Sequence, residues 1–393
     1  MLVILLILMQ VLFLKRKNEM PKKVLIVYAT GGMGHVKAAK AVEEAFRAKY
    51  PQVEIENVDI INFANKFYKW FFVDGYNFIS AYIPNFWGWL YQKFDKKSSQ
   101  KFPSFLSRLA ISGRFIPFVL EFKPDFIVST HPLPMILISY SKTKEVIDIL
   151  SSIVVTDFGC HSFWVDPEVN FYFTATEDVA KCLRGYGVSN EKIVVCGIPI
   201  ELKFAENSNR QAVMKKFNLD PSLSTLLIVG GQFDFAALEM IISGIKEKQG
   251  NKIQFLVVAG RDAKLKENLD KSDFAKNSHV KTFGFVDNMD ELMTVSDLIF
   301  SKAGGLTVSE CLAKGLPLVI NKVIPGQEED NVEYLVSKGA AIKANDFFGI
   351  IAAVNQLLGQ PEKISNMKKA AKIIGKPNSA TTLADFVYKR ISG

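Results

Sequence analysis

The feature of this 393-residue chain that most limits its fold is a regular alternation of short β-branched segments with helical patterns. Such alternation is typical of βαβ units, which build parallel sheets. A first series begins at Val24 and ends near Gly197. A polar stretch at 206–211 follows, and a second series begins at 224. The pattern therefore predicts two α/β domains, each with a doubly wound parallel sheet.

The predicted strands of both domains are rich in Val, Ile, Leu and Phe. They lie at 24–30, 53–60, 125–130, 152–158, 171–176 and 192–197 in the first domain, and at 224–231, 252–260, 280–285, 297–304 and 317–323 in the second. Because open parallel sheets bind ligands at the carboxyl ends of their strands, we expect a site in a central cleft that both domains face. We place the limits at 1–19 for a hydrophobic leader or a misassigned start, 20–203 for the N-terminal domain, 204–360 for the C-terminal domain, and 361–393 for a helical tail.

Composition supports a folded protein. Hydrophobic residues make up 49% of the chain and charged residues 22%, which excludes a disordered or collagen-like protein. The four cysteines show no CxxC spacing; they are Cys160, Cys182, Cys196 and Cys311. This spacing predicts neither a disulfide framework nor a zinc ribbon, and it favours a reducing cytoplasm.

An apolar run opens the chain and ends in three basic residues, Lys15, Arg16 and Lys17. The run is shorter than the ~20 residues that span a bilayer, and no A-x-A cleavage site follows it. It is either a short membrane anchor or a segment upstream of a true start at Met20, because the first predicted strand begins only at Val24. A secretory signal is a third reading, which the unpaired cysteines disfavour.

The formal net charge is +8, and most of it lies in one segment. Between 63 and 123, the basic aromatic region, nine Lys or Arg residues face three acids, a net charge of +6. This region also holds twelve of the 31 Phe and three of the four Trp residues, with the cations between them. The most prominent members are Trp70, Trp87, Trp89, Lys96 and Lys97.

Interleaved cations and aromatic rings are typical of a protein at an anionic bilayer surface, where each basic residue contributes ~1 kcal/mol. An aromatic core insert is the plainer interpretation of the same region. Nucleic acid is the other cationic partner, but no RNA- or DNA-binding motif accompanies the patch, so none is predicted.

A glycine-rich turn, Thr30 to His35, leads from the first predicted strand into a helix. Free backbone N–H groups and the positive end of the helix dipole make such a turn suitable for an anion. The turn is not the G-x-G-x-x-G of dinucleotide binders, which argues against a nicotinamide cofactor. His35 begins the helix, and an imidazole there can accept a proton from an acceptor hydroxyl.

Further polar and aromatic residues follow other predicted strands of the first domain: His131, Asp157, His161 and Trp164. Strand ends are where an open α/β sheet holds its ligands. The structural alternative is that Asp157 caps a loop and that the two histidines pack locally. The histidines lack metal-site spacing and no D-x-D follows a strand, so no metal is predicted.

The most specific motif of the second domain runs from Ser301 to Glu310. Gly304 and Gly305 would let a diphosphate approach a helix N-terminus, where Thr307 adds a hydroxyl donor. Glu310, one turn or more along, can accept hydrogen bonds from two ribose hydroxyls. Gln327 and Asn331 are four residues apart at the start of the next predicted helix, so both can bind sugar hydroxyls.

These motifs resemble those of the diacylglycerol glycosyltransferases, which include bacterial processive glucosyltransferases and plant monogalactosyldiacylglycerol synthases of glycosyltransferase family 28. The resemblance covers roughly 24–335 and rests on GGMGH, HPLP, TDFGCHSFW, TATEDVAKCLRGYGV, VVCGIPI, GFVDNMDELMTVSDLIFSKAGGLTVSECLAKGLPLVI and IPGQEEDN. The chain is more distantly similar to the transferase that adds N-acetylglucosamine to lipid-linked peptidoglycan precursors. The resemblance implies a GT-B fold, a UDP-sugar donor, metal-independent inversion and no cofactor.

The resemblance also implies roles for individual residues. It places the donor diphosphate at Gly304, Gly305 and Leu306, the ribose at Glu310, the sugar at Gln327 and Glu328, and the uracil near Phe285 and Val286. It places His35 at the catalytic centre, with Asp157 as a second candidate for the base. The acceptor and membrane side comprises Gly32, Gly34, His131, His161 and Trp164 together with the basic aromatic region. Met33 departs from the family pattern at this turn, where plant relatives carry Gly.

The sequence thus predicts an inverting transfer of a hexose from a UDP-sugar to a diacylglycerol-type lipid, making a β-glycolipid at the cytoplasmic face of a membrane. The protein would be peripheral or held by a short anchor. One alternative is an N-acetylglucosamine transfer from its UDP-sugar to another lipid. Another is a UDP-sugar 2-epimerase-like isomerase, and a third is a non-catalytic sensor of UDP-sugar.

Overall fold

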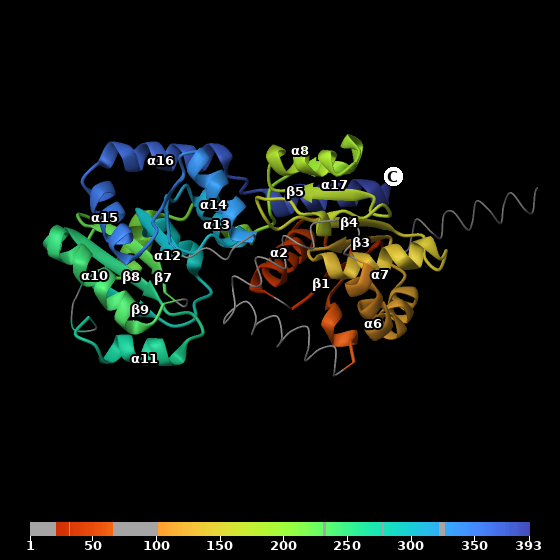
Figure 1. The fold of residues 1–393 in the computed structure, drawn as a ribbon, viewed down its shortest axis with the longest axis horizontal. Helices are drawn as coiled ribbons and strands as arrows, with labels where there is room; N and C mark the ends of the chain where they lie inside the picture. Colours follow the sequence, from red (N-terminus) through yellow and green to blue (C-terminus); the bar gives the residue numbers. More distant parts are fainter. Residues whose placement is uncertain are drawn as a thin grey trace, which may run out of the picture.

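The computed structural model describes residues 21–30, 32–65, 101–230, 233–274, 276, 279–321 and 327–393, with backbone alone at 101–110, 112 and 327. Two α/β domains lie side by side in Figure 1. The apolar leader and the predicted membrane residues Trp70, Trp87, Trp89, Lys96 and Lys97 lie outside the described residues, so the predictions made for them stay predictions.

The N-terminal domain contains a six-stranded sheet in the order β2-β1-β3-β4-β5-β6, and every strand pair is parallel. Its strands are β1 (Lys23–Tyr28), β2 (Glu54–Asp59), β3 (Phe126–Ser129), β4 (Leu150–Val154), β5 (Phe171–Thr174) and β6 (Ile193–Val195). Order β2-β1-β3 places the chain reversal between β1 and β3, where the ends of these strands open a crevice. Each strand falls within or overlaps a predicted segment.

The C-terminal domain repeats this architecture in the order β12-β11-β10-β7-β8-β9, again with parallel pairs throughout. Its strands are β7 (Ser224–Val229), β8 (Ile253–Val258), β9 (Val280–Phe283), β10 (Leu298–Ser301), β11 (Leu318–Ile320) and β12 (Ala341–Lys343). Only β12 lacks a counterpart among the predicted strands. The predicted fold class, two doubly wound α/β domains, is confirmed.

Helices cover both faces of each sheet (Figure 1). Those of the first domain are α2 (Met33–Lys49), α6 (Lys101–Phe122), α7 (Pro132–Thr143) and α8 (Glu177–Gly185), with 3₁₀ turns η1 (Ile60–Phe63), η4 (Ser162–Trp164), η5 (Asn190–Lys192) and η6 (Leu202–Phe204). Those of the second are α9 (Arg210–Lys216), α10 (Phe235–Gln249), η7 (Gly250–Lys252), α11 (Ala263–Lys271), α12 (Met289–Val295), α13 (Gly305–Lys314), α14 (Gln327–Ser337), α15 (Phe347–Leu358) and α16 (Pro361–Ile374). The chain ends with α17 (Ser379–Ser392).

Alternating strand residues build a core on each face of a sheet. Leu25 and Val27 of β1 join one apolar cluster, whereas Val24 and Ile26 join another. All four are fully buried. Strands covered on both faces read as continuous apolar runs, which is why the pattern predicted parallel sheets so directly.

The predicted helical tail divides between the two domains. Helix α16 packs on α13 of the C-terminal domain, whereas α17 packs on α2 of the N-terminal domain. The rings of Tyr50 and Tyr388 stack at 3.9 Å between centroids, and the Tyr50 hydroxyl donates to Asp385 at 2.6 Å. Leu383 and Val387 are fully buried in the N-terminal core.

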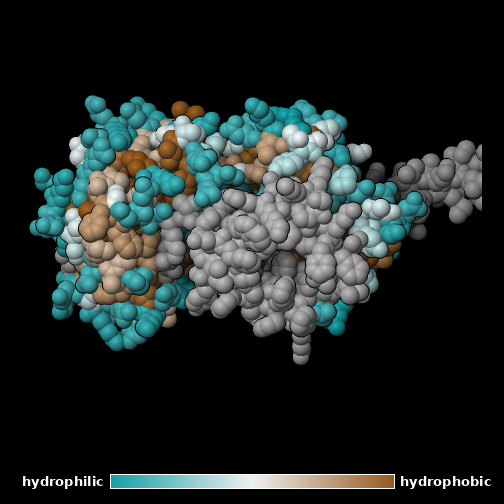
Figure 2. All heavy atoms as spheres, viewed as in Figure 1, coloured by the Kyte–Doolittle hydropathy of each residue, from teal (hydrophilic) through white to brown (hydrophobic). Residues whose placement is uncertain are grey.

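Hydrophilic residues form the outer margins of both domains on the face that Figure 2 shows. Within the described ranges, no helix combines the length and the apolar character needed to cross a bilayer. Among the residues that the structure describes, exposed apolar side chains are scattered, and the most exposed of them are Ile373 and Phe348.

Candidate active site in the interdomain cleft

The two domains touch where helices α2 and α13 begin. A Cβ placed on Gly305 would lie 2.1 Å from the backbone carbonyl oxygen of Thr156, so only glycine permits this approach. Nearby, a Cβ on Gly34 would lie 3.7 Å from Leu306 Cδ2, an ordinary contact. The predicted acceptor-side and donor-side turns therefore face each other directly.

His35 lies at the meeting point of three strand ends. Its Nδ1 lies 2.6 Å from the carbonyl oxygen of Thr130, after β3, and 3.2 Å from the hydroxyl of Thr156, after β4. A carbonyl oxygen can only accept, so Nδ1 carries the hydrogen and Nε2 keeps a lone pair. The Thr130 hydroxyl in turn donates to the His35 carbonyl at 2.9 Å.

The His35 ring is unprotonated at neutral pH. Burial lowers the pKa of His35 to about 4, although its hydrogen bond with the Thr130 carbonyl opposes that shift. The ring is therefore neutral at pH 7, with Nε2 able to take a proton. The Thr130 bond fixes the tautomer and the orientation of the ring, and the role of His35 as the proton acceptor stays a prediction.

Two of the predicted acceptor-side residues surround His35. The His131 ring meets the His35 ring edge to face at 4.6 Å, and the Trp164 ring lies 6.3 Å away. His131 also caps α7, since its Nδ1 accepts from the Leu133 N–H at 3.0 Å. Burial lowers the pKa of His131 well below its usual value, and the nearby His35 lowers it further.

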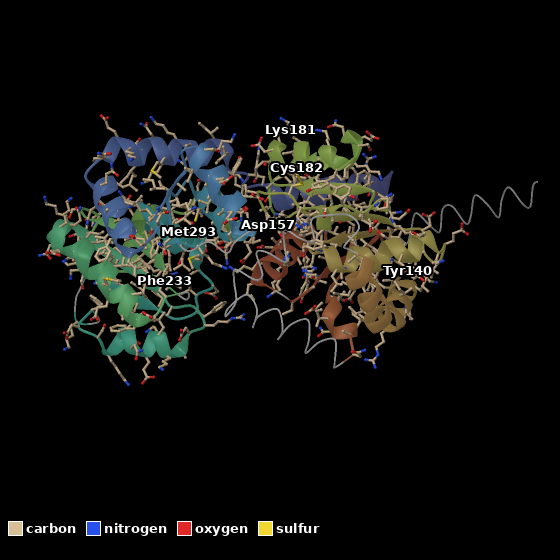
Figure 3. All side chains as sticks on the ribbon, in the orientation of Figure 1. Tyr140, Asp157, Lys181, Cys182, Phe233 and Met293 are labelled. Carbon is tan, nitrogen blue, oxygen red and sulfur yellow. A yellow bond between two sulfur atoms is a disulfide. The ribbon has the colours of Figure 1, made fainter. Side chains whose placement is uncertain are left out.

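His161 has a capping role of its own. Its Nδ1 accepts from the Phe163 N–H at 3.1 Å, and its ring stacks on Phe163 at 4.2 Å. The local packing considered from the sequence thus describes His161 well. Asp157 is buried in the loop after β4, where the two domains meet (Figure 3). Its neighbour Thr156 contacts both His35 and Gly305, so Asp157 lies close to the proposed centre.

That loop contains the one clear correction to the sequence analysis. Cys160 forms a disulfide with Cys182 of α8, with the Cα atoms 6.2 Å apart. The prediction that the cysteines are unpaired was therefore wrong for this pair, because residues 22 apart are brought together by the packing of α8 against the loop. Cys196 and Cys311 are free and buried, as expected of small apolar side chains.

The donor side is organised around Glu310. Its carboxylate is buried, with 3% of the residue exposed, and lies 3.6 Å from the Lys37 ammonium of α2. Burial raises the pKa of Glu310 to about 7, Glu201 adds to the rise, and Lys37 and Lys203 oppose it. An acidic group that titrates near neutrality in a cleft is a candidate ligand-binding group.

Other predicted donor residues lie around the start of α13. Gly304 is its N-cap, Thr307 is half-buried in its first turn, and Gly315 ends the helix in the left-handed conformation. Lys302 lies 3.3 Å from the buried carboxylate of Glu328, and a Cβ on Gly304 would meet both side chains at ordinary distances. The side chain of Gln327 is outside the described residues.

Asn331 has protein partners on both sides of the cleft. Its amide donates to the Ala303 carbonyl at 2.8 Å, and its Oδ1 accepts from the Phe158 N–H at 2.7 Å. The residue is fully buried. A role in binding sugar hydroxyls stays a prediction, and the contacts give Asn331 a different function, which is to link the two domains.

The predicted uracil end is open. Phe285 is 62% exposed, and the Arg261 guanidinium lies 5.3 Å from its ring centroid. Both residues line a depression of about 630 Å³ at the ends of β8 and β9. Val286 is half-buried and packs on the core beside the depression.

Three cationic residues near the proposed site were not predicted from the sequence: Lys37, Lys302 and Arg261. Each has a weak signal in hindsight: Lys37 follows His35 by two residues, and Lys302 precedes the glycine pair. Arg261 follows Gly260, which lies two residues after the end of β8. Lys302 lies inside the Ser301–Glu310 motif but was given no role, and Lys37 and Arg261 belong to no spaced motif, so proximity in the fold was needed to find these contacts.

Two models of known protein families match this chain. The family model for monogalactosyldiacylglycerol (MGDG) synthase matches residues 35–200, and that for the glycosyltransferase family 28 C-terminal domain matches 225–383. A processive diacylglycerol β-glucosyltransferase of Bacillus cereus is 31% identical over 377 residues, which is 93% of each chain. The chain belongs to the diacylglycerol glycosyltransferase family. The enzyme of the same name from Bacillus subtilis is 29% identical over 94% of this chain and 95% of its own length.

Solved structures give the fold of this diacylglycerol glycosyltransferase family member. MurG of Acinetobacter baumannii superposes with a TM-score of 0.58 at 15% identity, covering 94% of this chain and all of that one. The UDP-GlcNAc 2-epimerase of Neisseria meningitidis, bound to UDP-GlcNAc, gives 0.57 at 16% identity over the same shares. The fold is GT-B, as predicted. Because transferases and epimerases share it, the fold alone does not separate these reactions.

Proposed function

We propose that this protein transfers a hexose from a UDP-sugar to the hydroxyl of a diacylglycerol-type lipid, with inversion at the anomeric carbon. The observation that carries the proposal is the position of His35, whose Nδ1 lies 3.2 Å from the hydroxyl of Thr156. The backbone of the same threonine packs against Gly305 at the start of α13. The full-length relatives named as diacylglycerol β-glucosyltransferases support the same lipid chemistry.

The mechanism follows from the two sides of the cleft. Nε2 of His35 accepts the proton of the lipid hydroxyl, and that oxygen forms a bond to the anomeric carbon. The bond from this carbon to the diphosphate oxygen breaks on the opposite face, so an α-linked donor yields a β-glycoside. The N–H groups at the start of α13 stabilise the departing UDP, which is where such sites gain most of their rate. The proposed reaction uses no cofactor.

The proposal extends to the membrane. The basic aromatic region at 63–123 carries a net charge of +6 and is suited to bring the cleft to an anionic lipid surface on the cytoplasmic side. The acceptor is insoluble, so an enzyme that acts on it must reach the bilayer either through such a region or through an anchor.

The test uses the purified full chain with anionic vesicles that contain diacylglycerol, supplied with UDP-glucose or UDP-galactose. UDP release and new glycolipid are measured together, and a version starting at Met20 shows whether the leader is needed. Glycolipid from one donor supports the proposal and identifies the sugar. UDP-sugar binding without any glycolipid would contradict it, and a 2-epimer formed without lipid would instead establish an isomerase.

A further inference from the structure

Among the donor-side residues that the structure describes, only Glu310 combines near-complete burial with an ion pair to the opposite domain. Its partner Lys37 lies on α2, in the same helical turn as His35. The lysine side chain is 36% exposed, whereas that of the glutamate is 4% exposed. The cation therefore stands between the buried carboxylate and solvent.

Other charged groups around Glu310 do not serve it as well as Lys37 does. Lys203 is committed elsewhere, because its ammonium lies 2.8 Å from Glu201 and donates to the Asp287 carbonyl at 2.6 Å. Glu201 carries a negative charge that works against ionisation of Glu310. On the same helix, the neighbouring Cys311 thiol has its pKa raised well above the usual value by burial and by Glu310, so it stays neutral.

We propose that Lys37 is the counter-ion that keeps Glu310 charged for the donor ribose, so that donor affinity depends on a residue of the acceptor-side domain. This inference rests on the proposed function, in which Glu310 accepts hydrogen bonds from the ribose hydroxyls. Lys37 acts through Glu310 and is a positioning residue. Because Lys37 follows His35 by two residues, a displacement of the first turn of α2 would move the base and would also weaken binding of the donor.

The physical basis is the balance between burial and charge. A buried carboxyl that titrates near pH 7 is only half ionised there, and a carboxylate accepts two hydroxyl donors better than a neutral carboxyl does. Loss of an opposite charge within 4 Å raises such a pKa by about one unit or more. Without Lys37, Glu310 would therefore be largely protonated at pH 7 and would recover its charge only at higher pH.

The test measures binding of UDP-glucose, and in parallel of UDP-galactose, by calorimetry from pH 6 to pH 9. The diphosphate of these donors does not titrate in this range, and the uracil N3–H, which begins to ionise near pH 9, affects every variant equally, so the difference between variants reports the protein. We expect Lys37→Met to weaken binding about tenfold at pH 6 and less than about twofold at pH 9. Lys37→Arg should retain the wild-type profile. Lys40→Met, an exposed lysine one turn along the same helix, is the matched control and should not differ from wild type.

A double-mutant cycle separates charge from packing. Glu310→Gln should bind weakly with no pH dependence, and adding Lys37→Met to it should cost nothing further. A loss in Lys37→Met that is equal at pH 6 and pH 9, or one that adds fully to Glu310→Gln, would overturn the inference and leave the proposed function standing. If neither UDP-sugar binds the unchanged protein, the proposed function and this inference both fail. Thermal unfolding of each variant confirms that it is folded.

Discussion

Gly305→Ala is the substitution whose effect the structure defines most sharply. The new Cβ would lie 2.1 Å from the Thr156 carbonyl oxygen and 3.2 Å from its carbon. Contacts under 3.0 Å do not occur, so α13 and the loop after β4 must separate by at least about 0.9 Å. The carbonyl cannot rotate away cheaply, because the Thr156 side chain is held at His35. The substitution therefore moves one half of the proposed site against the other.

The expected magnitude follows from that displacement. Overpacking of this kind costs about 1–3 kcal/mol in stability, and a shift of about 1 Å between reacting groups costs ~100-fold in rate. Gly304→Ala is the control, because the described atoms within 4 Å of its Cβ would be only Lys302 Cε, at 3.7 Å, and Glu328 Oε1, at 3.9 Å. We expect Gly305→Ala to lower the unfolding temperature and Gly304→Ala to leave it unchanged. We also expect kcat/KM to be lower for Gly305→Ala than for Gly304→Ala.

The assay combines thermal unfolding with UDP release on diacylglycerol vesicles. If the two glycines only cradled a phosphate, both alanine variants would lose activity alike and neither would lose stability. That result would refute the assignment of Gly305 to the contact between domains. A Gly305→Ala protein with unchanged unfolding temperature and kcat/KM would refute it as well.

Three further outcomes are expected. His35→Ala should lower kcat by ~10²–10⁴ without weakening UDP-sugar binding. Because the pKa of His35 is about 4, the kcat of the wild-type protein should stay level from pH 8 to pH 5.5, and an inflection near pH 6.5 would contradict this. Reduction of the bond between Cys160 and Cys182, which closes 22 residues, should destabilise the protein by ~3 kcal/mol, and thiol counts of two before and four after reduction would verify the pairing. Asn331→Ala leaves the buried Phe158 N–H without its acceptor, so denaturant unfolding should show a loss of about 1–3 kcal/mol, and a loss below about 0.5 kcal/mol would contradict the bridge.

Local pattern was sufficient to predict the sheets and the setting of His35. The strands before Thr130 and Thr156 are neighbours, since β1 pairs with β3 and β3 with β4, so residues at their carboxyl ends had to converge. The β12 strand was not predicted, because it has only three residues at a sheet edge and these show too little periodicity.

Contacts that depend on how separate elements dock could not be predicted from the sequence. The i, i+4 spacing of Gln327 and Asn331 predicted that both lie on one helix face. In the folded protein the buried Asn331 side-chain amide makes hydrogen bonds with backbone groups of Phe158 and Ala303. The ion pair of Lys37 with Glu310 depends on how two domains meet, and the spacing of Cys160 and Cys182 matched no motif. Each of these contacts joins residues that are far apart in the sequence, so helix and strand periodicity could not predict it.

The return of α17 to the first domain has a consequence for the order of folding during synthesis. Leu383, Ala384, Val387 and Ile391 complete a core that begins at β1, yet they are made only after the whole second domain. The N-terminal domain therefore emerges from the ribosome with one side of α2 uncovered and cannot reach its final stability until α17 docks. A chain cut just before Ser379 would leave the second sheet intact and expose apolar surface on the first.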